Sequence, residues 1–158
     1  MAVVSNAGPL IALARIDHLD LLEELYNEIV VPPAVSHEIM RDPDLPGALS
    51  LKQAPWLRVE AVNDRTAVER LRFWLDQGES GAIILAQELD ATLLIDERRG
   101  RTIAAALGLQ YTGTVGMLLA AKQNGHVERV MPLLDALIVA GIRLSNRLYE
   151  EARQLAGE

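Results

Sequence analysis

The segment Ala91-Thr92-Leu93-Leu94-Ile95-Asp96 decides the fold class, because it is a short apolar run that ends in a single acid. A continuous apolar run of this length is typical of a strand buried on both faces, as in a parallel sheet covered by helices. Residues 97–107 then have a helical pattern, and Gly108 stands at the usual position of a helix C-terminus. We therefore predict a strand followed by a helix, with Asp96 at the carboxyl end of the strand.

The same alternation of strand and helix extends along the chain. Further strands are expected at residues 2–5, 28–31, 56–60 and 109–111. Helices are expected at residues 10–15, 34–41, 66–75, 79–89, 115–123, 130–140 and 146–155, with another after Asp17, and Gln77-Gly78 is expected to break the helical pattern. Residues 42–55 are predicted to form a loop or a short helical excursion. This order predicts a single α/β domain over residues 1–158, with helices on both faces of a parallel sheet.

The composition supports a small globular α/β protein. Half of the residues are hydrophobic but only 4% are aromatic, so the core must be built from Ala, Leu, Ile and Val. The chain has no cysteine, which excludes disulfides, thiolate zinc sites and a cysteine nucleophile. The absence of cysteine and of an apolar membrane segment leads us to expect a soluble protein of the reducing cytoplasm, without a membrane partner.

The formal charge of −7 comes from 15 basic and 22 acidic residues. This balance argues against a general nucleic-acid coat protein, which would present a basic face. It does not exclude a nuclease, because a metal site is itself acidic and bound metal restores attraction to phosphate.

Four polar side chains stand at predicted strand ends or on helices beside apolar segments: Asn6, Glu38, Glu79 and Asp96. Carboxylate and amide oxygens are the ligands that Mg²⁺ and Mn²⁺ prefer. In parallel sheets, ligands bind at the carboxyl ends of the strands, where Asn6 and Asp96 are expected. A helix that leads into a strand would usually start at the opposite edge, so the helix that carries Glu79 must be oriented to return its first turn to the site.

Each of these residues also has an ordinary structural role. Asn6 suits a helix N-cap, Asp96 suits an N-cap for the helix after it, and Glu79 suits the positive end of a helix dipole. Glu38 suits a solvated helix position. These alternatives stay open from the sequence alone.

Several motifs occur together in an order that resembles the PIN domain. They are Ser5-Asn6-Ala7-Gly8-Pro9-Leu10-Ile11, Pro32-Pro33-Ala34-Val35 with Glu38, Gly78-Glu79-Ser80-Gly81-Ala82-Ile83, and Leu94-Ile95-Asp96-Glu97-Arg98-Arg99-Gly100-Arg101. The chain is most similar to the small prokaryotic branch of the family that contains VapC-like toxins. The resemblance implies a three-layer α/β/α fold with a central parallel sheet of about four to five strands.

The resemblance also implies an Mg²⁺- or Mn²⁺-dependent endoribonuclease, the toxin of a toxin–antitoxin pair. Its catalytic and metal-binding residues would be Asn6, Glu38, Glu79 and Asp96, although the family usually has Asp at the position of Asn6. An amide brings an oxygen ligand but no charge. The alternative is therefore a catalytically weak or inactive module that binds RNA or protein. A metal-dependent phosphatase or a DNA nuclease on a related fold is a third possibility.

Substrate and partner residues follow from the same reading. Arg98, Arg99 and Arg101 are the densest basic cluster and would bind RNA phosphates, unless they form an ordinary salt-bridged helix face. Thr112 and Thr114 would bind phosphate or simply cap a turn.

The resemblance further implies a homodimer and a small antitoxin, for which Phe73 and Trp74 are plausible contacts. With Trp56, these aromatics are too few and too dispersed to predict a base-stacking platform, and we expect them in the core or at an interface.

Overall fold

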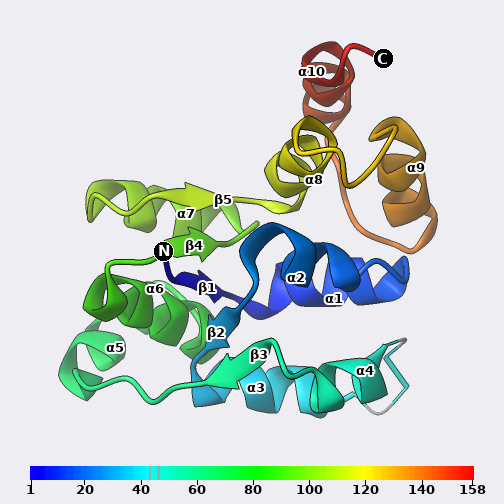
Figure 1. The fold of residues 1–158 in the computed structure, drawn as a ribbon. Helices are drawn as coiled ribbons and strands as arrows, with labels where there is room; N and C mark the ends of the chain where they lie inside the picture. The colour runs from blue at the N-terminus through cyan, green and yellow to red at the C-terminus, as the bar shows by residue number, and fades with distance from the viewer. Residues whose placement is uncertain (43, 46) are drawn as a thin grey trace.

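A computed structural model describes residues 1–42, 44–45 and 47–158, and its centre is a parallel sheet (Figure 1). The sheet contains five short strands in the order β3-β2-β1-β4-β5, and every neighbouring pair is parallel. The strands are β1 (Val3–Ser5), β2 (Ile29–Val31), β3 (Leu57–Val59), β4 (Thr92–Leu94) and β5 (Tyr111–Thr112). The α/β class and the parallel sheet predicted from the sequence are confirmed.

Helices cover both faces of this sheet in a three-layer α/β/α arrangement. They are α1 (Ala7–Arg15), α2 (Asp20–Tyr26), α3 (Pro33–Met40), α4 (Ala48–Gln53), α5 (Arg65–Leu71), α6 (Gln77–Leu89), α7 (Arg98–Ala106), α8 (Thr114–Gln123), α9 (Met131–Val139) and α10 (Asn146–Ala156). Helix α6 packs on β1 and β4, and α3 packs on α6. In Figure 1, α8, α9 and α10 lie together at one side of the sheet.

The core is aliphatic, as the composition requires. All residues of β1 and β2 are buried, and so are Leu93 and Leu94 of β4. The core side of α6 is lined by small and branched side chains such as Ala82 and Ile83. Each fully buried Val, Leu or Ile side chain stabilises the fold by roughly 1.5–3 kcal/mol relative to exposure.

Three local expectations are wrong. Gln77 and Gly78 do not break the helical pattern but form the first turn of α6, because Asp76 caps that helix. The turn at residues 72–76 ends α5 earlier than the pattern predicts. The last strand is shifted to Tyr111–Thr112, since Leu93 and Leu94 pair with these residues. Residues 42–55, predicted to form a loop or a short helical excursion, contain the short helix α4, while Pro43 and Pro46 lie outside the described residues.

The strand order places a topological switch between β1 and β4. From β1 the chain moves outward through β2 to β3, and then returns past β1 to form β4 and β5 on its other side. The connections on the two sides of such a point diverge and leave a crevice at the carboxyl ends of the strands. Asn6 directly follows β1, and its backbone N–H donates to Leu94 O at 2.9 Å. The fold therefore places Asn6 at this crevice, and Asp96 follows shortly after the end of β4.

No helix among the described residues is long and apolar enough to cross a membrane.

Candidate active site

Asn6 is buried at the start of α1, and the environment of its side chain is unusual. It occupies the N-cap position in an extended conformation, but no capping hydrogen bond to its side chain is found among the described residues. Its Oδ1 is buried and has no hydrogen-bond partner in the same part of the chain. A buried amide oxygen without a partner costs free energy on the order of 1–3 kcal/mol. The capping role considered for Asn6 therefore does not account for its side chain.

Gly78 lies where Asn6 and Glu38 approach the first turn of α6. A Cβ placed on Gly78 would lie 2.9 Å from Glu38 Oε2 and 3.6 Å from Asn6 Oδ1. Both oxygens therefore face the same point on α6, and the glycine leaves the Glu38 carboxylate in a place from which an added Cβ would shift it. The glycine is the local reason why residues 72 positions apart in sequence meet.

Glu79 follows Gly78 and belongs to the same edge of the sheet. The first turn of α6 does return to the site, because a Cβ on Gly78 would lie 3.6 Å from the Oδ1 of Asn6, which directly follows β1. Helix α6 leads into β4 and runs antiparallel to it, so its N-terminus points back to the carboxyl ends of the strands. Asp76 fixes this turn by accepting a hydrogen bond from the Glu79 N–H at 2.8 Å.

Burial and neighbouring acids raise the pKa of two of these carboxyl groups. Desolvation by the surrounding protein and then repulsion from Asp76 raise the pKa of Glu38. Arg41 opposes this shift, and the Glu38 side chain keeps contact with solvent. Burial is the largest cause of the raised pKa of Glu79, followed by repulsion from Asp76 and, more weakly, from Glu97 and Glu38. A hydrogen bond with the Asp76 backbone partly offsets this rise. Desolvation and the neighbouring acids thus disfavour the anionic forms of both groups.

Asp96 is held in place from the other side of the crevice. Its Oδ1 accepts the Thr114 N–H at 2.7 Å, and its Oδ2 accepts the Thr114 hydroxyl at 2.6 Å. Asp96 thus binds the N-terminus of α8 rather than that of α7, whose N-cap is Glu97. The alternative role as a cap for the following helix is wrong. A Cβ on Gly8 would lie 3.8 Å from Asp96 Oδ2. Asp96 therefore lies next to the first turn of α1, which follows Asn6.

The donors at this edge suit a hard divalent cation, although they are not gathered around one point. Within residues 1–42, 44–45 and 47–158, no three His, Cys, Asp or Glu side chains are close enough together to hold one metal ion. All four candidate ligands nevertheless supply oxygen atoms, and the buried Asn6 oxygen has no other described partner. Mg²⁺ and Mn²⁺ are bound by a few such oxygens, with water completing the coordination.

A family model described as a PIN domain matches residues 2–158. The chain belongs to the PIN-domain family. No curated protein matches the sequence. PIN domains are typically nucleases that use divalent metal ions, and a nucleic acid is the substrate that the family suggests. The resemblance seen in the sequence motifs is confirmed.

The three arginines that follow Asp96 form no ion pair with an acid among the residues that the structure describes. Among the ion pairs between described residues, none includes Arg98, Arg99 or Arg101, so the salt-bridged face considered for them is not observed. Arg99 Nη1 donates to Trp74 O at 3.2 Å, and the Arg101 guanidinium lies 5.2 Å from the centre of the Tyr111 ring. Arg98 is exposed.

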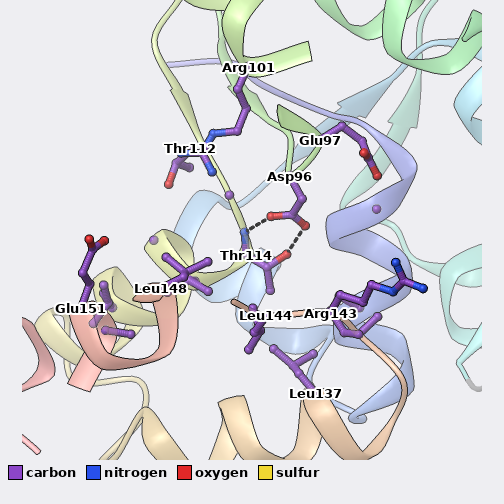
Figure 2. Close-up of a pocket in the computed structure, with 18 of the residues that line it drawn as sticks. Asp96, Glu97, Arg101, Thr112, Thr114, Leu137, Arg143, Leu144, Leu148 and Glu151 are labelled. Atoms are coloured by element: carbon purple, nitrogen blue, oxygen red, sulfur yellow. Dashed lines mark hydrogen bonds between the residues drawn. The ribbon is translucent and has the colours of Figure 1, made fainter. Parts of the chain in front are cut away.

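A cavity of about 770 Å³ adjoins Asp96 (Figure 2). Asp96, Glu97, Arg101 and Thr112 lie along one side of it, and α9, α10 and the segment between them supply apolar side chains on the other. These apolar residues include Leu137, Ile142, Leu144, Leu148 and Leu155. Thr112 faces the cavity, whereas the Thr114 hydroxyl is already bonded to Asp96. Of the two threonines expected to bind phosphate, Thr112 is therefore free to reach a ligand in the cavity, whereas the Thr114 hydroxyl is occupied by Asp96.

Sequence reasoning missed three residues of this site. Asp76 influences both Glu38 and Glu79, and the pattern Asp76-x-x-Glu79 is a helix-start signal that was available in the sequence. Gly78 was interpreted as a helix breaker. Gly113 allows α8 to approach Asp96, because a Cβ there would lie 2.6 Å from Asp96 Oδ1. No local pattern distinguishes such packing glycines from turn glycines.

Proposed function

We propose that this PIN domain is a divalent-metal-dependent endoribonuclease, and that it acts in the cytoplasm as the toxin of a toxin–antitoxin pair. The observation that carries the proposal is the buried Asn6 oxygen, which has no hydrogen-bond partner within the described part of the chain and faces the same point as Glu38 at the switch between β1 and β4. A polar atom in this state is stabilised by a ligand that accepts its lone pairs. The adjoining carboxylates favour a cation as that ligand.

Asn6, Glu38, Glu79 and Asp96 would hold Mg²⁺ or Mn²⁺. When bound, the ion would supply charge to stabilise the transition state of phosphodiester hydrolysis and lower the pKa of a water nucleophile. The protein's own contribution is orientation. Thr114 fixes both oxygens of Asp96, and Asp76 fixes the turn that carries Glu79.

RNA would be bound by the arginines that follow Asp96. Arg98 is exposed and Arg101 and Thr112 line the cavity, so these groups are available to phosphate oxygens. Arginine suits this role because its planar guanidinium donates two parallel hydrogen bonds to phosphate. Thr114 would act through Asp96 rather than on the phosphate.

The second candidate function is a catalytically weak or inactive PIN module that binds RNA or protein. It is favoured by the neutral Asn6 and by the lack of a three-acid cluster among the residues that the structure describes. Metal affinity distinguishes the two candidates, because a binding module does not require tight coordination of a divalent cation.

The test is calorimetric titration with Mn²⁺ of the wild-type protein, Asp96→Asn and the control Glu128→Gln. Glu128 is an exposed acid outside the site. The nuclease proposal expects binding in the micromolar to low millimolar range, lost in Asp96→Asn and kept in Glu128→Gln. Equal binding by all three proteins would show that the sites titrated are unspecific, and no binding by any would favour the inactive module.

The toxin assignment has its own test. Induced expression in a bacterium should arrest growth with the wild-type chain and not with Asp96→Asn, and RNA from arrested cells should contain new cleavage ends. Growth arrest that persists in Asp96→Asn would contradict a toxic nuclease. The expected homodimer is checked by sedimentation of the purified protein, and the antitoxin by whether a small co-expressed protein restores growth.

A further inference from the structure

Phe73 and Trp74 form an exposed aromatic pair beside the acidic site. Phe73 is 84% exposed and Trp74 is 59% exposed, and their ring centres are 6.1 Å apart. Trp56, by contrast, is buried in the core, as expected. The expectation that the aromatics are too dispersed for base stacking therefore applies to Trp56 and not to this pair.

The position of the pair is fixed by its neighbours on both sides. Leu75 is buried and anchors the turn between α5 and α6, so the two residues before it project outward. The Trp74 carbonyl accepts a hydrogen bond from Arg99 of α7 at 3.2 Å. Two residues later, Asp76 caps the helix turn that contains Glu79. These two contacts place the turn that carries the pair next to the start of α7 and the candidate catalytic turn of α6.

The charge around this pair is opposite to that of the whole chain. Residues 64–76 and 97–101 contain six of the chain's 15 basic residues, all arginines, and four acids, Asp64, Glu69, Asp76 and Glu97. Glu69 pairs with Arg72. In a chain of net charge −7, this is a local concentration of cations next to two exposed aromatic rings.

We propose that Phe73 and Trp74 are a nucleobase-stacking shelf that selects single-stranded RNA. The inference rests on the proposed nuclease function and specifies its substrate. Aromatic side chains combined with arginines are how proteins bind single strands, because every unpaired base offers a π-face while the cations hold the backbone. A duplex keeps its bases stacked internally and cannot use the shelf. Arginines beside exposed rings suit the negative backbone and the unpaired bases of a single strand together, which makes RNA the favoured occupant.

The test measures binding without cleavage, in EDTA, with a labelled eight-nucleotide single-stranded RNA and the matching duplex. We expect the wild-type protein to prefer the single strand, and Trp74→Leu and Phe73→Leu each to weaken its binding about 5- to 100-fold, the range measured for loss of base stacking. Trp74→Phe should bind nearly as the wild type does. The control Val139→Ser changes an exposed apolar residue outside these segments, 89% exposed on α9, and should have no effect.

Tryptophan fluorescence gives an independent readout. Unlabelled RNA should quench the emission of the exposed Trp74, and the quenching should vanish in Trp74→Phe although that variant still binds. Circular dichroism checks that each variant is folded.

The outcomes separate this proposal from the nuclease assignment. Wild-type affinity and wild-type cleavage in Trp74→Leu would overturn the shelf alone. Binding that depends on Trp74 without any cleavage would contradict the nuclease and keep the shelf. Absence of single-strand binding, or a dimer that dissociates only in Trp74→Leu while RNA binding is unchanged, would show that the pair serves another partner.

Discussion

Asp96 accepts two hydrogen bonds from Thr114, one from its backbone N–H at 2.7 Å and one from its hydroxyl at 2.6 Å. The first uses a free N–H at the start of α8, where the helix dipole favours an anion. The second fixes the rotation of the carboxylate. Asp96 is therefore oriented before any ligand arrives.

Replacing Thr114 by Val should weaken Mn²⁺ binding while leaving the fold intact. Valine keeps the shape and the backbone N–H but cannot donate to Asp96 Oδ2, and loss of such an outer partner typically costs about 10- to 100-fold in metal affinity. Calorimetry with Mn²⁺ measures this change. Thr114→Ser keeps the hydroxyl and should behave as the wild type. Equal affinity in Thr114→Val would show that the bond does not orient the carboxylate.

Replacing Asn6 by Asp should raise Mn²⁺ affinity by roughly tenfold or more, because a charged ligand replaces a neutral one. The same change should lower the Tm in EDTA, since it adds a buried anion beside Glu38. Thermal melts with and without Mn²⁺ test both effects, because a ligand that binds only the folded state raises the Tm. A melt that does not respond to Mn²⁺ would place Asn6 outside the metal site.

Replacing Gly78 by Ala should displace the Glu38 carboxylate and leave stability within about 1 kcal/mol of the wild type. The new Cβ would lie 2.9 Å from Glu38 Oε2, the mobile end of a side chain, and alanine favours a helix by roughly 0.5–1 kcal/mol over glycine. Mn²⁺ affinity should fall. The matched control is the same change in a Glu38→Ala background, where it should have no further effect. An equal loss in both backgrounds would mean that Gly78 acts on something other than Glu38.

Acidification should stabilise the metal-free protein through Glu38 and Glu79. Both groups have a raised pKa in the folded state, so the folded state binds protons more tightly than the unfolded state does between the usual and the raised pKa. Their contribution to stability falls as the pH rises through this window. Glu79→Gln should thus raise the Tm in EDTA at pH 7. Mn²⁺ binding has the opposite dependence and weakens as these ligands are protonated.

Glu158 should show the reverse pH dependence. Its side chain accepts the N–H groups of Val130 and Met131 at the start of α9 and contacts Lys122 at 2.9 Å. Chiefly because of the Val130 bond, its pKa is lowered from 4.5 to about 2. This stabilisation is complete above pH 4.5 and is lost as the pH falls towards 2.

Thermal melts of Glu158→Gln should give a lower Tm than the wild type at pH 7, and the difference should shrink as the pH approaches 2. The control Glu150→Gln removes an exposed pair with Arg153 and should change the Tm little. A difference that persists unchanged at low pH would mean that packing, rather than charge, explains the loss.

The elements of this protein are determined mainly by local patterns that the sequence displays. The apolar run before Asp96 predicted a buried parallel strand, and Ser145 caps α10 as its position suggests, by accepting the Leu148 N–H at 3.1 Å. Periodicity works here because each short strand and each helix buries its own apolar residues. It fails at the junctions, where Gln77 and Gly78 look like a break but begin α6.

The sequence alone determined an α/β parallel sheet, an aliphatic core and a set of candidate oxygen ligands. Only the tertiary structure decided which of them face one another. Strand order placed β1 beside β4, so residues separated by about 90 positions lie at one crevice. Gly78 and Gly113 then let the Glu38 and Asp96 carboxylates approach closer than an added Cβ would allow without a shift. Such contacts depend on packing between segments that are far apart in the sequence. The local sequence pattern around a glycine does not show which distant side chain will pack against it.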